Sequence, residues 1–184
     1  MLPAGQTRPS PLICLTGFMG TGKSTVARLL ARQIGWRHAD LDQRIVQDTG
    51  VSIPAFFAQY GEPAFREVER EQLRRIEGES REQAAPTIVS LGGGTTAQPG
   101  NLEFLRANGA RLIWLHCPIE ELLSRISRMN DRPLFRDETS FRQLYEQRLA
   151  FYELSDYRVE TNIEPLRVVE QILAIAAIFD RVQA

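Results

Sequence analysis

A glycine-rich loop near the N-terminus has the residue types and spacing to bind phosphate. Residues 17–24, with the sequence GFMGTGKS, fit the pattern G-x-x-x-x-G-K-[ST]. The apolar run Leu12 to Leu15 precedes the loop, and a helical pattern that includes Thr25 follows it. Backbone N–H groups in such a loop and the positive end of the helix dipole attract phosphate oxygens. The pattern therefore predicts a phosphate site, the alternative being an ordinary glycine turn before a helix.

Individual residues of this loop have distinct chemical tasks. Lys23 can reach the terminal phosphates of a nucleotide, and the Ser24 hydroxyl can ligate Mg²⁺. The glycines permit backbone angles that other residues avoid, so the loop can approach the phosphates closely. The predicted nucleotide-binding residues of the loop are Gly20, Thr21, Gly22, Lys23, Ser24 and Thr25.

Two carboxylates, Asp40 and Asp42, follow a short extended segment at residues 37–40. Alternate residues at a strand end point in the same direction. A metal needs a carboxylate nearby, directly or through water, so one aspartate can face the metal and the other an acceptor hydroxyl. The alternative is that they cap the following helix, a task that Asp42 suits.

Arginines and a second glycine segment are candidates for binding the phosphate acceptor. Arg66 and Arg148 lie on charged helical patterns, where the alternative is a solvent-facing ion pair with a carboxylate four residues away. The triplet Gly92-Gly93-Gly94 follows a buried strand pattern. Such glycines allow a ligand to approach the backbone closely, the alternative being a flexible turn.

A polar segment at about residues 127–138 contains Asp131-Arg132-Pro133-Leu134 and has arginines around it. Polar loops of this kind often act as lids over an active site. A lid arginine such as Arg132 can neutralise charge that develops on a transferred phosphoryl group. The alternative is a solvated surface loop.

The elements that must position these residues form an α/β pattern, because short apolar runs alternate with longer helical ones. We expect about five parallel strands, covered by helices on both faces. The predicted strands are residues 12–16, 37–40, 87–91, 111–115 and 157–160. The predicted helices are about 23–34, 42–49, 52–60, 62–77, 101–108, 118–125, 140–154 and 164–182. Ligands bind outside the carboxyl ends of such strands, so Gly17, the two aspartates and Gly92 should converge on one crevice.

Composition limits the class of protein. The 184 residues, with a formal net charge of −1, predict a single domain at 12–184 after a flexible tail at 1–11, with neither a nucleic-acid nor a membrane partner. Cys14 and Cys117 lie in or beside apolar runs and are expected to be buried free thiols of a cytoplasmic protein. His38 and His116 are isolated in the sequence, and we expect both to be structural.

Taken together, the motifs resemble those of shikimate kinases, within the nucleoside-monophosphate-kinase-like P-loop fold. The matching segments come in the family order over about residues 12–180. They are residues 17–24, Asp40-Leu41-Asp42, residues 65–69 (FREVE), Gly92-Gly93-Gly94, Arg132-Pro133-Leu134, and Arg148 with Tyr152.

The resemblance implies a three-layer αβα kinase with a mobile lid and a known reaction. ATP phosphorylates the 3-hydroxyl of shikimate in the biosynthesis of chorismate and the aromatic amino acids, with one Mg²⁺ per subunit. The partners implied are shikimate and ATP, and we expect a monomer.

The resemblance also implies residue roles. Asp42 binds the acceptor hydroxyls and is placed to act as base, while Arg66 and Arg148 hold the shikimate carboxylate beside residues 92–94. On the donor side, Ser24 and Asp40 lie near Mg²⁺, Arg125 packs on the adenine, and Arg132 is the lid arginine. Lys23, Asp42 and Arg132 are the predicted catalytic residues.

The chain departs from the family pattern at Phe135, at Thr95-Thr96 and at Ser155, which bear on the lid and the pocket lining. Two alternatives stay open. One is another small-molecule kinase of this fold, such as a gluconate or nucleotide kinase. The other is a non-catalytic ligand sensor, although Lys23 and Asp42, which a sensor could lose, are both present.

Overall fold

A computed structural model describes residues 12–127 and 137–175 of the chain. The strands in this part are β1 (Leu12–Thr16), β2 (Arg37–Asp40), β3 (Thr87–Ser90), β4 (Arg111–His116) and β5 (Tyr157–Glu160). The helices are α1 (Lys23–Ile34), α2 (Leu41–Thr49), α3 (Ile53–Glu82), α4 (Asn101–Ala107), α5 (Ile119–Ser127), α6 (Glu138–Tyr152) and α7 (Pro165–Leu173), with a 3₁₀ turn, η1 (Thr95–Ala97), after β3.

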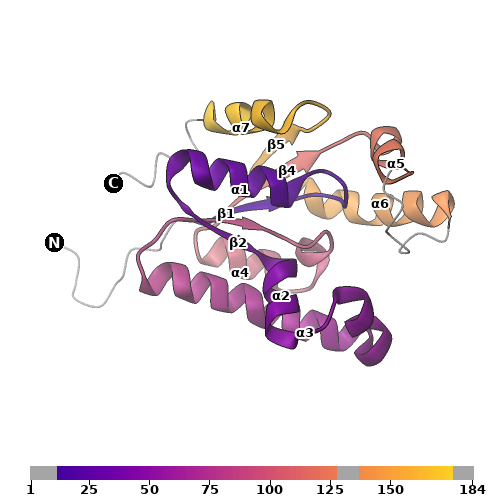
Figure 1. The fold of residues 1–184 in the computed structure, drawn as a ribbon, viewed down its shortest axis with the longest axis horizontal. Helices are drawn as coiled ribbons and strands as arrows, with labels where there is room; N and C mark the ends of the chain where they lie inside the picture. Colours follow the sequence, from indigo (N-terminus) through magenta and orange to yellow (C-terminus); the bar gives the residue numbers. More distant parts are fainter. Residues whose placement is uncertain (1–11, 128–136, 176–184) are drawn as a thin grey trace.

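The five strands form one parallel sheet in the order β2-β3-β1-β4-β5 (Figure 1). Central strand β1 pairs Leu12 with Thr87 of β3 and Ile13 with Arg111 of β4. The predicted α/β fold and the predicted strands are confirmed, with ends that differ by one residue at most.

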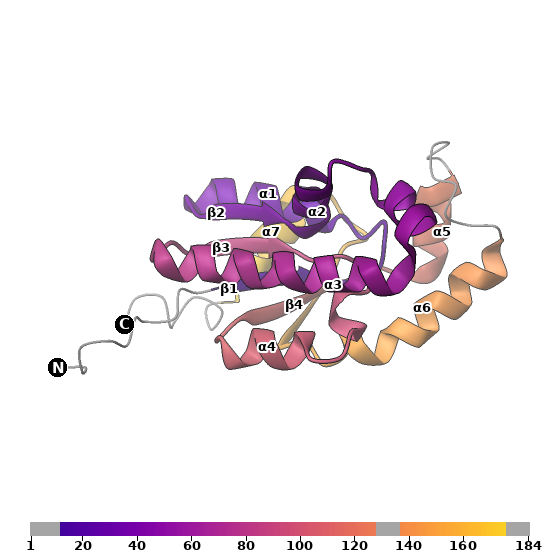
Figure 2. The same ribbon diagram turned by 90° about the horizontal axis from the view of Figure 1, so that it is seen from below.

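Helices cover both faces of the sheet, which gives the three layers that the sequence predicts (Figures 1 and 2). Side chains alternate along β1: Leu12 and Cys14 pack with α3 and α4, whereas Ile13 and Leu15 pack with α1 and α7. Because β1 is buried on both faces, it reads as a continuous apolar run. A third apolar cluster joins Phe18 of the glycine-rich loop to α5 and α6.

Helix ends agree with the sequence signals at several positions. Gly35 ends α1 in the left-handed conformation and donates its N–H to Ala31 O. Ser52 caps α3 by accepting a hydrogen bond from Ala55 N–H. The two helices predicted at 52–60 and 62–77 are joined in α3, which has non-helical backbone at Gly61 (φ 77°, ψ 172°).

Helix α2 begins at Leu41, one residue before the predicted start, and Asp40 caps it. The capping alternative for the aspartate pair therefore applies to Asp40, although Asp42 also suited that task. The predicted end of the closing helix is wrong. The closing helix ends at Leu173, because its last turn tightens and Ile175 N–H bonds to Ile172 O, three residues back. Val168 and Ile172 of this helix are both buried against the sheet.

Candidate functional site

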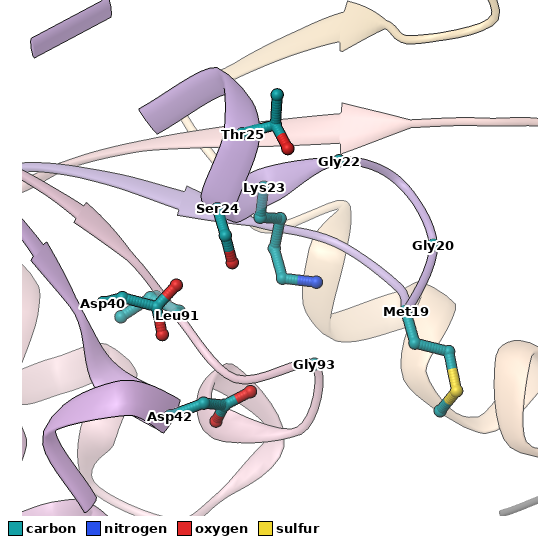
Figure 3. Close-up of a pocket in the computed structure, with 10 residues that line it drawn as sticks. All are labelled: Met19, Gly20, Gly22, Lys23, Ser24, Thr25, Asp40, Asp42, Leu91 and Gly93. Carbon is teal, nitrogen blue, oxygen red and sulfur yellow. The ribbon is translucent and has the colours of Figure 1, made fainter. Parts of the chain in front are cut away.

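A cavity of about 270 Å³ opens at the carboxyl ends of β1, β2 and β3. Figure 3 shows how residues far apart in the sequence surround it. Its lining residues are Met19, Gly20, Gly22, Lys23, Ser24, Thr25, Asp40, Asp42, Leu91 and Gly93. The predicted convergence of the strand-end segments is therefore observed, because parallel strands present their carboxyl ends at one edge.

The glycine-rich loop has the geometry of an anion site. Helix α1 begins at Lys23 after Gly22, which has positive φ (89°), and no side chain caps its N-terminus. The N–H groups of the first turn are therefore available to an anion in the cavity. Gly17 is restricted to glycine, since its φ is 140° and a Cβ atom there would lie 2.5 Å from Leu115 O.

Lys23 folds back over this loop. Its Nζ atom donates hydrogen bonds to the carbonyl oxygens of Gly17 and Phe18, each at 2.9 Å. Figure 3 shows the amine reaching into the space between the loop and Gly93. A phosphate oxygen is a stronger acceptor for an ammonium group than these carbonyls are. The lysine can therefore turn to a nucleotide phosphate with a small movement of its side chain.

Ser24 and Asp40 form a corner of hard oxygen atoms. Asp40 accepts from Gln43 N–H (3.0 Å) through Oδ1 and from the Ser90 hydroxyl (2.7 Å) through Oδ2. Burial raises the pKa of Asp40, but hydrogen bonds from Ser24, Gln43 and Ser90 outweigh it and hold the pKa below its ordinary value. An ionised carboxylate beside a serine hydroxyl is a donor set that suits Mg²⁺.

In the described part of the chain, no three His, Cys, Asp or Glu side chains gather into a metal cage. A site formed by Ser24 and Asp40 would therefore take its other ligands from phosphate and water. Mg²⁺ is commonly bound in this way, through one or two carboxylates together with substrate phosphates.

The acceptor side is organised around the glycine triplet. A Cβ atom on Gly92 would lie 3.0 Å from Asp42 Oδ1, and one on Gly94 would lie 3.0 Å from Arg66 Nη2 and 3.1 Å from Arg148 Nη2. Residues of α2, α3 and α6 therefore meet at the loop after β3. Two guanidinium groups opposite a carboxylate form a site for a small polar anion.

Arg66 is held by two carboxylates of its own helix. Its Nη1 atom donates to Glu69 Oε2 (2.9 Å), and its Nη2 atom donates to Glu62 Oε1 (2.9 Å). Glu69 is buried, with 1% of its surface exposed, and its Oε1 atom accepts from the Thr95 hydroxyl at 2.7 Å. Sequence reasoning missed the role of Glu69, because a glutamate in a charged helical pattern resembles a solvent-facing one.

Arg148 is supported by aromatic side chains. Its guanidinium lies 5.7 Å from the centre of the Phe18 ring, which links α6 to the glycine-rich loop. Tyr152, one turn further along α6, is buried and donates its hydroxyl to Gly93 O at 2.5 Å. Burial raises the pKa of the Tyr152 hydroxyl, so the tyrosine keeps its proton at neutral pH.

A second cavity, of about 250 Å³, lies on the other side of the glycine-rich loop. Arg125 borders it and donates to Gly20 O (3.3 Å) and Thr161 O (2.8 Å). The other lining residues are Thr21, Gly22, Val26, Thr161, Ile163, Glu164, Pro165 and Val168. The sequence pointed to Arg125 but not to the segment after β5, since only the fold brings that segment beside the loop.

The remaining sequence predictions divide into three groups. Arg132 and Phe135, with most of the predicted lid, lie outside the described residues, as do residues 1–11. Cys14 and Cys117 are both free and buried, as predicted. His116 contacts Glu160 through Nδ1 at 2.6 Å, which agrees with a structural role.

Comparisons with known proteins point to one family. The sequence profile of shikimate kinases matches residues 19–177. A shikimate kinase of Geobacter metallireducens is 41% identical over 153 residues, which are 82% of this chain and 82% of that protein. The crystal structure of a shikimate kinase from Acinetobacter baumannii in complex with shikimate superposes with a TM-score of 0.81, at 33% identity, over 94% of this chain and 96% of that one.

A more distant likeness concerns the fold alone. A gluconokinase from Sinorhizobium meliloti has a TM-score of 0.58 and 18% identity over 96% of this chain and 97% of its own. Among the described residues, no helix is both long enough and apolar enough to span a lipid bilayer.

Proposed function

The chain belongs to the shikimate kinase family, and we propose that its strand-end crevice transfers the γ-phosphoryl group of ATP to the 3-hydroxyl of shikimate through the residues described above. This reaction belongs to the biosynthesis of aromatic amino acids. The observation that carries the residue assignment is the meeting of Asp42, Arg66 and Arg148 around residues 92–94, across the cavity from Lys23.

On the donor side, the glycine-rich loop binds the phosphates of ATP. Backbone N–H groups at the start of α1 and the Lys23 ammonium neutralise the negative charge that the phosphoryl group carries during transfer. The cavity beside Arg125 takes the adenine, since it is continuous with the loop through Thr21 and Gly22, which line it. Lys23, Ser24 and Thr25 follow directly at the N-terminus of α1.

On the acceptor side, the carboxylate and the reacting hydroxyl of shikimate each have a counterpart. The guanidinium groups of Arg66 and Arg148 hold the carboxylate, since arginine offers planar, bidentate geometry. Asp42 accepts a hydrogen bond from the reacting hydroxyl and takes its proton as the oxygen attacks the γ-phosphorus. The backbone of residues 92–94 borders the pocket, and a side chain on Gly94 would displace both arginines.

Ser24 and Asp40 would hold Mg²⁺, and their hydroxyl and ionised carboxylate fit this ion. When bound, Mg²⁺ would offset the negative charge of the phosphate groups. Asp40 is kept ionised by its hydrogen bonds, and Ser90 and Gln43 fix its orientation.

Further parts of the proposal rest on sequence. Arg132 in a lid at residues 127–138 neutralises charge on the phosphoryl group, and the chain acts as a monomer. Two free, buried thiols support a cytoplasmic location.

A coupled ADP-release assay with shikimate, gluconate and nucleoside monophosphates tests the proposed acceptor. We expect turnover with shikimate alone, because gluconate is an open chain that does not hold its carboxylate and hydroxyls in the ring geometry of shikimate. Comparable turnover with gluconate and none with shikimate would overturn the assignment. No turnover with any acceptor would favour the ligand-sensing alternative.

A further inference from the structure

We infer, on the basis of the role proposed above for Arg66, that Thr95 is a positioning residue for shikimate binding. Its hydroxyl fixes the buried carboxylate of Glu69, and that carboxylate fixes the guanidinium of Arg66. Thr95 itself has no exposed surface, so it acts on shikimate only through these two side chains.

The buried partner of Arg66 fixes one side of its guanidinium group. The Glu62 side chain is 61% exposed, whereas the Glu69 side chain is 1% exposed. An exposed ion pair is weakened by solvent and by side-chain freedom, but a buried one holds a defined geometry. Glu62 accepts from Nε (3.1 Å) and Nη2 (2.9 Å) of Arg66, whereas Glu69 accepts from Nη1 (2.9 Å) in a buried site. The position of the Nη1 side of the guanidinium therefore depends on Glu69.

Glu69 uses its two oxygen atoms for different partners. Oε2 accepts from Arg66 Nη1 at 2.9 Å, and Oε1 accepts from Thr95 Oγ1 at 2.7 Å. A carboxylate out of contact with water needs donors for both oxygens. The threonine hydroxyl therefore determines the rotation of the carboxylate about its long axis and, with it, the position of the oxygen that meets Arg66.

Thr95 is itself rigidly held. It is fully buried, its N–H donates to Gly92 O (3.2 Å), and its carbonyl accepts from Asn101 Nδ2 (3.0 Å). These bonds tie the hydroxyl to the same loop that lines the acceptor pocket. Thr95, Glu69 and Arg66 thus form a continuous hydrogen-bonded chain from the glycine loop to the predicted carboxylate site.

Loss of the hydroxyl would disturb the pocket in a defined way. A Cβ atom on Gly92 would lie 2.9 Å from Glu69 Oε1, 3.0 Å from Thr95 Oγ1 and 3.0 Å from Asp42 Oδ1, so these three oxygens cluster on one side of the loop. Without the threonine donor, the Glu69 carboxylate must rotate to find another. The Arg66 fork would then move out of the plane that suits bidentate binding.

The test compares two substitutions at Thr95, which distinguish the effect of its hydroxyl group from the effect of its packing. Thr95→Val keeps the shape and removes the donor, while Thr95→Ser keeps the donor and removes a methyl group. We expect Thr95→Val to raise the KM for shikimate about tenfold, with kcat and the KM for ATP within about twofold of the wild type. Thr95→Ser should bring the KM for shikimate back to within about twofold of the wild type.

Thr96→Val is the matched control. The Thr96 hydroxyl is also buried but lies 3.4 Å from that of Thr16, away from Glu69, so its removal should leave the KM for shikimate unchanged. If Thr95→Val does not fold, Glu69→Gln tests the same chain of contacts and should also raise the KM for shikimate about tenfold.

Arg66→Lys, measured beside these variants, distinguishes the role of Thr95 from the role of Arg66 itself. If Arg66→Lys raises the KM for shikimate but Thr95→Val does not, the role of Thr95 is wrong and that of Arg66 stands. If Arg66→Lys has no effect, the proposed carboxylate site is wrong. A result in which valine substitutes for Thr95 better than serine does would assign the residue to packing and overturn the inference.

Discussion

The guanidinium groups of Arg66 and Arg148 meet over the same glycine. A Cβ atom on Gly94 would lie 3.0 Å from Nη2 of the first and 3.1 Å from Nη2 of the second. One arginine comes from α3 and the other from α6. This pairing brings two guanidinium groups to one point beside the glycine triplet, an arrangement that suits bidentate binding of a carboxylate.

Gly94→Ala should weaken shikimate binding without unfolding the protein. Gly94 has φ −113°, which alanine can adopt, so the added methyl group acts only by pushing the two guanidinium groups aside. We expect the KM for shikimate to rise about 10- to 100-fold in steady-state assays.

Gly78→Ala is the matched control for Gly94→Ala. A Cβ atom at Gly78 meets no other atom within 4 Å, and alanine favours its helix, so kinetics should stay unchanged while stability rises by up to about 1 kcal/mol. If Gly94→Ala bound shikimate as the control does, the arginines would not hold the substrate at this glycine.

Tyr152→Phe should lower the free energy of unfolding by about 1–2 kcal/mol, measured by urea denaturation. The substitution removes the hydrogen bond to Gly93 O and keeps the buried ring. Because that bond ties α6 to the glycine triplet, the KM for shikimate should rise as well. A phenylalanine variant with unchanged stability and an unchanged KM would show that the bond does not hold the loop.

Lys23 is the only lysine in the chain, which makes it accessible to a selective chemical test. An amine-acylating reagent should modify Lys23 and the α-amino group, and activity should fall by about 10²-fold or more, because one preorganised charge is lost from the phosphate site. ATP should slow both modification of Lys23 and inactivation, as read by mass spectrometry and the ADP assay.

A Lys23→Arg variant controls for the α-amino group, since it has no side-chain amine. Its residual activity should be insensitive to the reagent. Inactivation of this variant at the wild-type rate would place the essential amine elsewhere.

Asp40 gives a prediction for pH. The folded-state pKa of Asp40 lies below its ordinary value, so its ionised form stabilises the fold. That contribution is complete above the pKa of the unfolded chain and is lost as the pH falls through the folded-state pKa. Asp40→Asn should therefore lower the free energy of unfolding near neutral pH, and the difference from wild type should shrink in acid.

Asp40→Ala distinguishes the effect of the carboxylate charge from that of the N-cap hydrogen bond of α2. Asparagine can still accept from Gln43 N–H, but alanine cannot, so the alanine variant should lose about 1 kcal/mol more at any pH. If the Asp40→Asn difference grew as the pH fell, the hydrogen bonds around Asp40 would not favour its ionised form.

Local patterns were enough to predict much of this molecule. Buried parallel strands read as apolar runs, so the three inner strands, β1, β3 and β4, were predicted with ends within one residue of those observed. The glycine-rich loop was recognisable because its residues are consecutive. The start of α2 was predicted one residue late, at Asp42, and so the sequence alone could not tell which of the two aspartates caps the helix.

Other features depend on contacts that no local pattern encodes. Glu69 lies in the run FREVERE, where alternating charges indicate a solvent-facing helix, yet α3 passes beside the glycine triplet and buries it. The cavity beside Arg125 needs the segment after β5 to lie against the glycine-rich loop. A buried carboxylate and an inter-element cavity are properties of the packed fold, not of a spacing in the chain.

The central claim is that Asp42 is the residue that activates the acceptor hydroxyl. The most direct measurement is kcat for Asp42→Asn, a substitution of equal size, in the coupled ADP-release assay with saturating ATP and shikimate. We predict a fall of about 10²- to 10⁴-fold, with thermal unfolding unchanged, because the amide cannot accept a proton. A kcat near that of the wild type would contradict the account.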